Sequence, residues 1–396
     1  MNASRIILVR YDEIGLKGKN RKFFLNRLLD NIKIKLSGMD NIRYAMPHGR
    51  ILIYLNEENA EECVDRLQFI PGIASVSVGI AVERDFDAMA DIGIRLIEPL
   101  LESEGSLKFC VRTNLADKSF PTNSRDCDFE VGSRIMDRLA EKGLVVNIKQ
   151  AEFVFEIEIG TKETVLFHKR VPGLRGLPVG SSGEALCLIS GGIDSPVAMS
   201  KMIRRGCRAH GIFFDNRPFL GRGGYDKVLR LSKIINRYQG GGRLYVVPFE
   251  NIQVAIRDHC RPPNRVVLYR RMMYRIAEEV AREFRFLALV TGEALGQVAS
   301  QTMENLAAVS KVVSMSVFRP LIGMDKVEII ALAKQLGTYE ISIEPQPDCC
   351  SIFMPNRPAT KSKMDLLEDD ENHYPWQNLM EEAIKNIEEI EVDELV

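Results

Sequence analysis

The stretch LISGGIDSPVAMSKMIRRG, residues 188–206, places a glycine-containing turn directly after an apolar run. Glycines at such a turn let backbone N–H groups approach an anion, and the N-terminus of the helix that follows adds partial positive charge. Asp194 and Ser195 stand where that helix would start. The residue types and their spacing therefore predict a phosphate-binding loop.

Two common phosphate-binding motifs are excluded at this turn. No lysine follows the glycines, so the GxxxxGK[ST] loop of P-loop kinases and GTPases is absent, and so is the dinucleotide fingerprint G-x-G-x-x-G. The six residues SGGIDS, 190–195, instead resemble the PP-loop of ATP pyrophosphatases, which cleave ATP between the α- and β-phosphates. An ordinary tight turn is the alternative, and six matching residues between a strand and a helix argue against it.

The neighbouring segments must position this turn. ALCLIS (185–190) predicts a buried strand, Pro196 suits the first helical position, Gly206 suits the C-terminal stop, and CRAHGIFF (207–214) predicts the next strand. From residue 185 onward, short apolar runs alternate with helical segments. Strands buried on both faces of a parallel sheet have this pattern. We therefore expect a doubly wound α/β domain.

Composition limits the class of protein. At 396 residues the chain is long enough for two or three domains, and its 45% apolar and 27% charged residues are typical of a soluble globular protein. No run reaches the roughly 20 apolar residues that span a bilayer, and the N-terminus lacks an apolar signal segment. The eight cysteines, mostly isolated, do not indicate a disulfide framework. These features predict a cytoplasmic protein that has no membrane partner.

The net charge of −1 hides a separation of charge along the sequence. Residues 365–396 hold twelve acidic residues and one lysine, a net charge of −11, whereas residues 1–364 carry +10 and residues 1–50 carry +7. A basic body indicates a polyanionic partner, and an acidic tail could compete with it. A solvated surface with a disordered end explains the same charges equally well. Within the tail, LMEEAIKNIEEI (379–390) has helical periodicity.

The first 170 residues have an α+β pattern. The strand-like RIILVRY (5–11) and RILIYL (50–55) alternate with amphipathic helical segments, which predicts a ferredoxin-like unit. A second α+β segment follows, and VPGLRGLPVGSSGE (171–184) is rich in glycine and proline, as linkers are. The loop after the first strand carries Lys17, Lys19, Arg21 and Lys22. Its charge and flexibility predict binding to a phosphate backbone, with a solvated loop as the alternative.

Further stretches resemble one PP-loop family, the tRNA 4-thiouridine synthetases (ThiI family). They are RYDEIGLKGKNRKFF (10–24), TGEALGQVASQT (291–302), RPLIGMDKVEII (319–330) and PDCCSIF (347–353). The segment from FCVRTNLADKSFPTNS to GLRGLPVG resembles a THUMP domain, an RNA-binding module. The resemblance implies an α/β plus α+β architecture of five parts. These are a ferredoxin-like domain (1–72), a THUMP domain (73–170), a linker (171–184), a PP-loop domain of the adenine nucleotide α-hydrolase type (185–360) and an acidic tail (361–396).

The activity that this resemblance implies is ATP-dependent tRNA sulfurtransfer. The uridine at position eight of tRNA would be adenylated, because its carbonyl oxygen is a poor leaving group, and sulfur would then replace O4. The implied cofactors are ATP and Mg²⁺, and the partners are tRNA and a sulfur donor, either a cysteine desulfurase persulfide or sulfide. The alternatives are sulfur transfer toward the thiazole of thiamine and a catalytically silent THUMP RNA-binding protein. Whether the chain forms a homodimer stays open.

The resemblance also assigns roles to individual residues. Its ATP-binding positions are Leu188, Ile189, Ser190, Gly191, Gly192, Ser195, Phe213, Phe214, Arg270, Gly292 and Gln301. The neighbouring THUMP-like segment favours tRNA as the ligand of the basic loop residues Lys17, Lys19, Arg21 and Lys22. The family often has histidine at position 213, so a backbone or stacking contact is expected from Phe213, with core packing as the alternative. No metal-ligating residues are assigned. Relatives with an iron–sulfur cluster have cysteines where Val266 and Tyr269 stand, and no rhodanese-like domain follows Pro358.

Three residues are the catalytic candidates. Asp194 suits Mg²⁺-pyrophosphate, with a helix N-cap as its alternative role. Lys326 lies inside an expected capping box, Asp325 to Glu328, at a helix start that disfavours a lysine, so we expect it to contact ATP phosphates or the adenylated intermediate. Cys350 aligns with the family's sulfur-transfer cysteine, and its neighbour Cys349 is expected to matter less. The alternative is that both cysteines are small buried hydrophobes.

Overall fold

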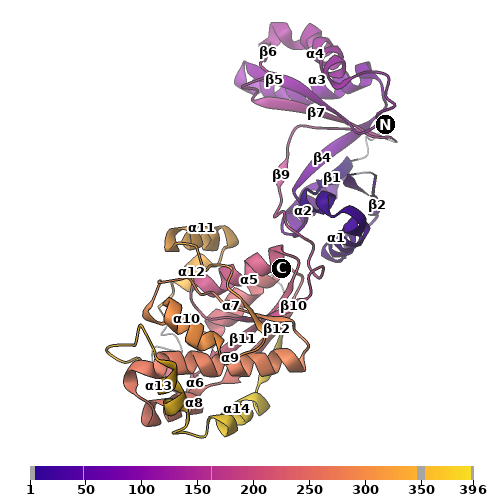
Figure 1. Cartoon of the computed structure of the whole chain (residues 1–396). Coiled ribbons are helices and arrows are strands. Elements are labelled where there is room, and N and C mark those ends of the chain that lie inside the picture. The colour runs from indigo at the N-terminus through magenta and orange to yellow at the C-terminus, as the bar shows by residue number, and fades with distance from the viewer. Residues whose placement is uncertain (1–4, 48, 162, 346–352, 394–396) are drawn as a thin grey trace. The chain divides into compact units, whose positions relative to one another are not determined.

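The computed structural model describes residues 5–47, 49–161, 163–345 and 353–393. The chain forms two compact units, Met1–Gly176 and Leu177–Val396 (Figure 1). In the described ranges, no helix is both long enough and apolar enough to cross a bilayer.

The N-terminal unit is built on one nine-stranded sheet. Its strand order is β2-β3-β1-β4-β8-β7-β5-β6, with β9 beside β4. The strands are β1 (Arg5–Arg10), β2 (Arg43–Ala45), β3 (Arg50–Leu55), β4 (Ser75–Val82), β5 (Leu107–Leu115), β6 (Leu144–Val146), β7 (Phe153–Ile159), β8 (Thr164–Phe167) and β9 (Val171–Pro172). Strand β4 pairs with β1 on one side and with β8 on the other, so the sheet is continuous across the unit.

Four α-helices complete the part of this unit that the structure describes. They are α1 (Arg21–Lys35), α2 (Ala60–Leu67), α3 (Phe86–Glu104) and α4 (Ser124–Leu139). Side chains of α1 and α2 share one apolar core with β1 and β3, whereas side chains of α3 and α4 share another with β5 and β7. Asp85 and Asn123 cap α3 and α4 by accepting hydrogen bonds from first-turn N–H groups, which fixes where these helices begin.

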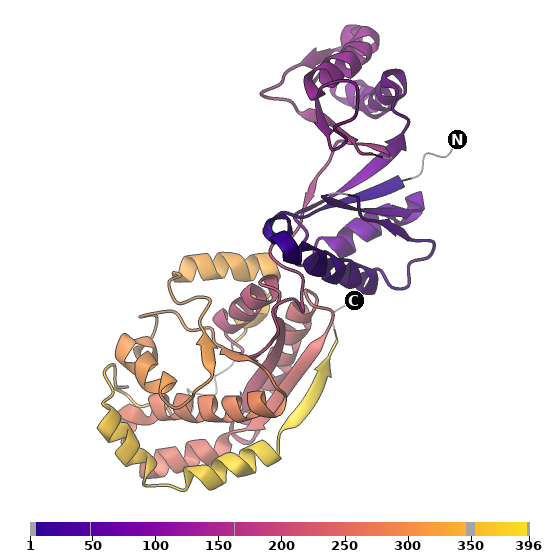
Figure 2. The same ribbon diagram turned by 45° about the vertical axis from the view of Figure 1, so that its right-hand side comes forward.

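The C-terminal unit contains a six-stranded sheet in the order β14-β13-β10-β11-β12-β15. Its strands are β10 (Glu184–Leu188), β11 (Arg208–Asp215), β12 (Gly242–Pro248), β13 (Ala288–Val290), β14 (Ser316–Phe318) and β15 (Glu388–Val392). The first five are parallel, and β15 is antiparallel to β12 at one edge, drawn in yellow in Figure 2. The chain proceeds from β10 outward to β12 and then crosses to β13 on the other side of β10. This confirms the doubly wound α/β prediction and puts a topological switch point between β10 and β13, where such sheets bind ligands.

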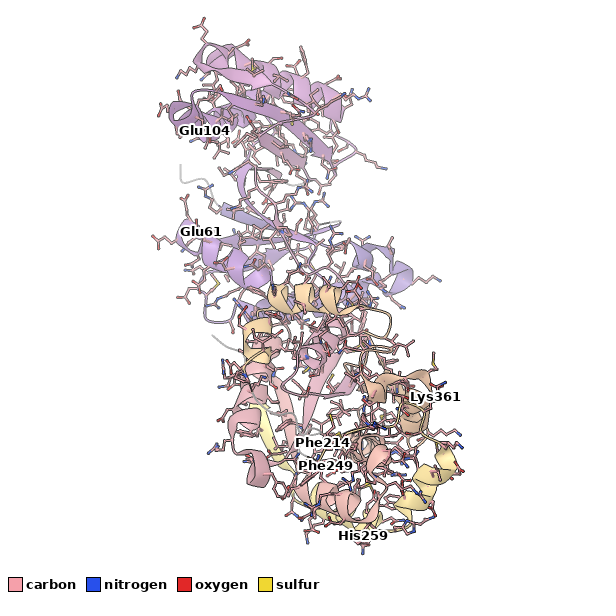
Figure 3. All side chains as sticks on the ribbon, turned by 90° about the vertical axis from the view of Figure 1, so that its left-hand side faces the viewer. Glu61, Glu104, Phe214, Phe249, His259 and Lys361 are labelled. Atoms are coloured by element: carbon pink, nitrogen blue, oxygen red, sulfur yellow. The ribbon has the colours of Figure 1, made fainter. Side chains whose placement is uncertain are left out.

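The helices of this unit lie between and after the strands. They are α5 (Asp194–Arg204), α6 (Arg217–Leu220), α7 (Gly223–Asn236), α8 (Glu250–His259), α9 (Arg265–Glu283), α10 (Met303–Ser310), α11 (Lys326–Leu336), α12 (Tyr339–Ser342), α13 (Met364–Glu371) and α14 (Trp376–Lys385). The core forms where α9 packs on the strands. Within it, Phe214 and Phe249 meet edge to face, with ring centroids 5.1 Å apart (Figure 3).

The acidic C-terminal segment is part of this unit. Strand β15 pairs with β12, and Glu371 of α13 accepts hydrogen bonds of 2.7–2.9 Å from Arg271 and Arg275 of α9. A disordered end, one of the alternatives for the acidic charges, is therefore wrong for residues 364–392. The helical periodicity of residues 379–390 holds only as far as Lys385, where α14 ends.

Candidate functional site

The SGGIDS turn joins β10 to α5 at the carboxyl end of a central strand. The backbone N–H of Ser190 donates to Oγ of Ser195 over 2.9 Å, and that of Gly192 donates to Oγ of Ser190 over 3.3 Å. The cap residue of α5, Ile193, gives no side-chain hydrogen bond to the helix. The positive end of α5 thus faces the turn without a side-chain cap, as an anion site requires.

Two local expectations at this turn need correction. Asp194 is the first residue of α5, so its alternative role as the N-cap is wrong. Pro196 is the third helical residue rather than the first, which is tolerated because the N–H groups of the whole first turn lack helical partners. Gly206 lies after the helix with a φ of +86°, in the left-handed region, as its role as a stop predicts.

Gly292 brings the loop after β13 against the start of α5. A Cβ atom at this position would lie 2.7 Å from the backbone nitrogen of Ser195 and 2.9 Å from the carbonyl carbon of Asp194. No other residue type fits without moving the backbone. The two loops therefore meet across the switch point between β10 and β13.

Asp194 and Lys326, predicted separately as catalytic candidates, are in contact. Nζ of Lys326 lies 2.6 Å from Oδ1 of Asp194, and Nε2 of Gln297 donates to Oδ2 over 2.9 Å. The side chains of Asp194 and Lys326 are 20% and 41% exposed. Lys326 is the first residue of α11, and the predicted capping box between Asp325 and Glu328 is confirmed. A carboxylate and an ammonium group thus stand together at the mouth of the glycine turn.

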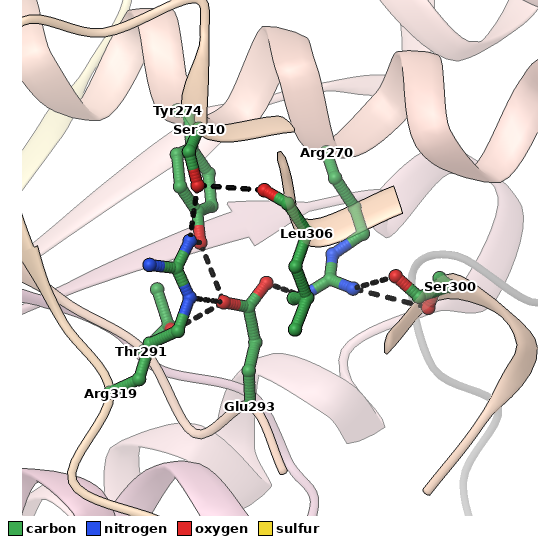
Figure 4. Close-up of polar contacts among 8 residues, drawn as sticks. All are labelled: Arg270, Tyr274, Thr291, Glu293, Ser300, Leu306, Ser310 and Arg319. Atoms are coloured by element: carbon green, nitrogen blue, oxygen red, sulfur yellow. Dashed lines mark hydrogen bonds and ion pairs between the residues drawn. The ribbon is translucent and has the colours of Figure 1, made fainter. Parts of the chain in front are cut away.

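A buried carboxylate lies directly after Gly292. Glu293 is 1% exposed and forms ion pairs with Arg270 and with Nε of Arg319, the latter over 2.5 Å (Figure 4). Burial opposes ionisation of Glu293, but the charges of Arg270 and Arg319 outweigh it and hold its pKa below the ordinary value. Two guanidinium groups face one carboxylate, so this cluster carries an excess positive charge.

Neutral groups fix the geometry of that cluster. Tyr274 and Thr291 donate to Glu293 through their hydroxyls over 2.8 and 2.9 Å. Arg270 donates to both the carbonyl and the Oγ of Ser300, each over 3.1 Å. The predicted ATP-binding arginine, carried by α9, is therefore held in place by the loop after β13 and by the turn that contains Ser300.

The remaining ATP candidates lie at the ends of β10 and β11 and in the turn after β13. Phe213 and Phe214 are 7% and 4% exposed, and Phe214 belongs to the core, so a nucleotide would meet their backbone rather than their rings. Leu188 ends β10, and the buried Ile189 follows it. Oε1 of Gln301 is buried without a hydrogen-bond partner among the described residues, which leaves an acceptor for a ligand donor.

The four cations predicted to bind tRNA belong to the N-terminal unit. Lys17 lies 3.2 Å from the carboxylate of Glu13, and Arg21 donates to the hydroxyl of Tyr11 over 2.9 Å. Lys19 and Lys22 are exposed. The loop therefore presents two cations to solvent and holds two against neighbouring side chains.

The predicted sulfur-transfer residue Cys350 and its neighbour Cys349 lie outside the described residues. The six described cysteines are all buried, and burial raises the pKa of each thiol, to about 12 for Cys63 and Cys260. Val266 and Tyr269 are buried on α9. Within the part of the chain that the structure describes, no group of three or more His, Cys, Asp or Glu side chains could hold a metal ion.

Several site residues were not predicted from the sequence. Glu293, Gln297 and Arg319 all lie inside stretches that carried the family resemblance, TGEALGQVASQT and RPLIGMDKVEII. An acidic residue directly after the predicted Gly292 was the available signal. Which arginines it would meet depends on the packing of α9 and on the end of β14, and this is not visible locally.

The chain matches three family models in sequence order. They are the ThiI ferredoxin-like domain over residues 6–77, the THUMP domain over residues 83–169, and the thiamine biosynthesis protein (ThiI) model over residues 180–375.

Similar proteins extend over the full chain. A probable tRNA sulfurtransferase of Halothermothrix orenii is 37% identical, covering 98% of this chain and 99% of that protein. Another, of Caldanaerobacter subterraneus subsp. tengcongensis, is 39% identical, covering 97% and 99%. A crystal structure of a 4-thiouridine synthetase–RNA complex with bound ATP matches with a TM-score of 0.88 and 36% identity, covering 98% of this chain and all of that one.

Proposed function

The chain belongs to the tRNA sulfurtransferase (ThiI) family, and we propose that it uses ATP to convert the uridine at position eight of tRNA into 4-thiouridine. The observation that carries this proposal is the contact between Asp194 and Lys326 at the mouth of the SGGIDS turn. The two residues are far apart in the sequence and meet at the switch point of a doubly wound sheet, where such folds bind ligands.

ATP binding follows from the groups around the turn. The N–H groups of the turn that do not already donate to the hydroxyls of Ser190 and Ser195, together with the N-terminus of α5, bind the phosphates that become pyrophosphate. Arg270, held by Glu293 and Ser300, supplies positive charge on the side of β13. The backbone at the ends of β10 and β11 and the free acceptor of Gln301 face the rest of the nucleotide.

Adenylation uses these groups to stabilise charge. O4 of the uridine attacks the α-phosphorus, the N3 proton is lost, and the bond from the α-phosphorus to the bridging oxygen breaks, so that pyrophosphate leaves. The negative charge that develops on pyrophosphate is stabilised by the amides of the turn, which are already oriented before reaction. Lys326 neutralises charge at the mouth, where its ammonium already meets Asp194.

The residues at the mouth fit a magnesium ion that is held mainly by substrate. Mg²⁺ in such sites takes one or two carboxylates together with phosphate oxygens. Asp194 would hold it, because each carboxylate oxygen keeps a second lone pair beside the hydrogen bonds to Lys326 and Gln297. When bound, the ion neutralises charge on the polyphosphate.

The sulfur step requires a nucleophile that the described thiols do not provide. A thiolate is the reactive form, and burial raises the pKa of all six described cysteines. We assign sulfur transfer to Cys350, which takes over the outer sulfur of a cysteine desulfurase persulfide while the desulfurase thiol leaves. That outer sulfur attacks C4 of the adenylated uridine, the bond from C4 to the adenylated oxygen breaks, and AMP leaves. A second thiol then attacks Sγ of Cys350, so that the S–S bond breaks, a disulfide forms and 4-thiouridine is released. With free sulfide as the donor, sulfide attacks C4 directly and no thiol takes part.

The proposal is tested by release of pyrophosphate from ATP with and without tRNA. We expect release only when tRNA is present. Release without tRNA would favour sulfur transfer toward a thiazole, and no release would favour an RNA-binding protein without catalysis. Nucleoside analysis of tRNA from cells with and without this protein provides the second measurement, and unchanged 4-thiouridine would contradict the proposal.

A further inference from the structure

Lys227 of α7 is buried beside the glycine turn, although the turn itself contains no lysine. Its side chain is only 5% exposed. A Cβ atom at Gly191 would lie 3.1 Å from Cδ of Lys227 and 3.5 Å from Cε. Because Nζ is one bond beyond Cε, the ammonium lies within about 5 Å of that position. A buried positive charge therefore adjoins the first glycine of the turn.

The ammonium is fixed by the end of α12. It donates to the backbone carbonyls of Ser342 and Glu344 over 2.9 and 2.8 Å. Oγ of Ser342 also lies 3.5 Å from the carbonyl oxygen of Gly192. Lys227 and the end of α12 together support both glycines of the turn, and the hydrogen bonds hold the charge at one place.

An ion pair between the same helix and the segment after α12 adds to this support. Arg230, three residues after Lys227, donates to both carboxylate oxygens of Glu344 over 2.8 and 2.7 Å. This pair is about half exposed, with side chains 51% and 40% accessible. The pair holds α12 against α7 but places no charge against Gly191. A substitution in this pair therefore tests the attachment of α12 independently of the charge of Lys227.

We propose that Lys227 is a positioning residue for pyrophosphate, which supports the first glycine of the turn and places a fixed positive charge beside the leaving group. This inference rests on the proposed function, because it assumes that the turn binds pyrophosphate. P-loop enzymes carry the corresponding lysine inside the loop, after the glycines. Here the charge comes from a neighbouring helix. At an effective dielectric constant of about 20, a unit charge anywhere within about 10 Å of a phosphate charge changes affinity by at least tenfold.

The alternative role of Lys227 is purely structural, as an anchor for the end of α12. The two roles predict different ligand dependence. An anchor affects all ligands of the site equally, whereas a charge beside the turn affects pyrophosphate far more than AMP, which lacks the β- and γ-phosphates.

The test measures dissociation constants for pyrophosphate with Mg²⁺ and for AMP by calorimetry on the full chain. The variants are Lys227→Gln, which keeps an N–H donor, Lys227→Arg, which keeps the charge, and Glu344→Gln, which breaks the ion pair with Arg230. Lys233→Gln on the same helix is the matched control. We expect Lys227→Gln to weaken pyrophosphate at least about tenfold while AMP changes less than about twofold. Lys227→Arg and Lys233→Gln should retain pyrophosphate binding.

Glu344→Gln decides between the charge and the anchor. It loosens α12 but removes a negative charge near Lys227, so we expect pyrophosphate to bind about twofold more tightly, and this sign remains measurable even where Lys227→Gln does not fold. Equal losses of AMP and pyrophosphate in Lys227→Gln, or weakened or unchanged pyrophosphate in Glu344→Gln, would overturn the inference. Failure of the proposed function is distinguishable. An RNA-binding protein without catalysis would bind neither ATP nor pyrophosphate in its unmodified form, whereas sulfur transfer toward a thiazole would retain pyrophosphate binding and show release without tRNA.

Discussion

Two of the carboxylate–cation groups in the C-terminal unit differ in their surroundings. Asp194 and Lys326 meet through one ammonium contact and are 20% and 41% exposed. Glu371 is 7% exposed and is paired on both oxygens by Arg271 and Arg275, whose side chains are 3% and 13% exposed. One group is open to a ligand, whereas the other is enclosed.

The difference in exposure predicts which of the two groups takes part in the reaction and which one stabilises the fold. A pair that is partly open to solvent contributes less to folding than an enclosed one, because water solvates its members, and a ligand can replace one of them. A buried group with saturated hydrogen bonds cannot exchange partners, and removing one member leaves an uncompensated charge in the interior. We therefore expect substitutions at Asp194 to stop the reaction and substitutions at Glu371 to destabilise the unit.

The largest effect is expected for Asp194→Ala. Loss of the carboxylate at the mouth of the turn should lower tRNA-dependent pyrophosphate release by about a hundredfold or more. The free energy of unfolding should change by less than about 1 kcal/mol. Asp226→Ala, an exposed acidic residue in the first turn of α7, is the control and should retain activity. A folded Asp194→Ala protein that released pyrophosphate normally would show that this carboxylate takes no part in the reaction.

Cys350→Ser distinguishes the sulfur-transfer step from the adenylation step. We expect it to block thiolation with a persulfide donor but to retain tRNA-dependent pyrophosphate release, because adenylation needs no thiol. Cys349→Ser should have the smaller effect. The measurements are 4-thiouridine content and pyrophosphate release on the same samples, and full thiolation by Cys350→Ser would remove this residue from the mechanism.

Glu371→Gln addresses the enclosed group. Breaking a buried charge network typically costs about 3–5 kcal/mol. In a unit of this size that corresponds to a melting temperature roughly 6–20 °C lower. Glu368→Gln, on the exposed side of the same helix, should change melting little. An unchanged melting temperature in Glu371→Gln would mean that the enclosed pairs are not what stabilises the acidic segment.

The acid limb of the stability curve tests the same group without changing the fold at neutral pH. Burial opposes ionisation of Glu293 and Glu371, yet their arginine partners hold each pKa below the ordinary 4.5. A depressed pKa in the folded state stabilises the protein above pH 4.5, and this stabilisation is lost as the pH falls through the folded-state pKa. Urea unfolding from pH 6 to pH 3 should show this loss, and Glu371→Gln should lose less over that range.

The smallest effect extends the comparison to the basic loop of the N-terminal unit. Replacing the exposed Lys19 and Lys22 with alanine should lower the slope of log binding constant against log salt by roughly 0.9 for each lost phosphate contact. Replacing Lys17 and Arg21 should lower it less, because Glu13 and Tyr11 already engage them. Titration of tRNA at several salt concentrations measures both slopes. Equal slopes would show that the exposed and the engaged cations contribute equally to tRNA binding.

Local patterns predicted part of the site. SGGIDS after an apolar run predicted a strand, a turn and a helix because all three are determined by residues within one short segment. The capping box around Lys326 was predicted for the same reason, since Asp325 and Glu328 satisfy each other's backbone groups. The family resemblance supplied Arg270 and Gln301, whose spacing alone indicates nothing.

Long-range packing produced what the sequence did not predict. Glu293 meets Arg270 and Arg319, and choosing these among 53 lysines and arginines requires knowing how α9 crosses the sheet. Lys227 lies in an unremarkable amphipathic helix, and only the approach of α12 shows its place beside the turn. Residues 388–392, EEIEV, carry little apolar character, yet they form β15 because the free edge of β12 is available to them.

Strand β15 also affects the order in which the chain can fold as it leaves the ribosome. The sheet of the N-terminal unit is complete once Pro172 has been synthesised. The edge of β12, formed by residues 242–248, stays unpaired until residues 388–392 emerge, about 140 residues later. During that interval the nucleotide-binding sheet has an open edge, which is the kind of surface that associates with other chains. Ribosome pauses before residue 388 would therefore lengthen the period in which this half of the nascent protein is prone to aggregate.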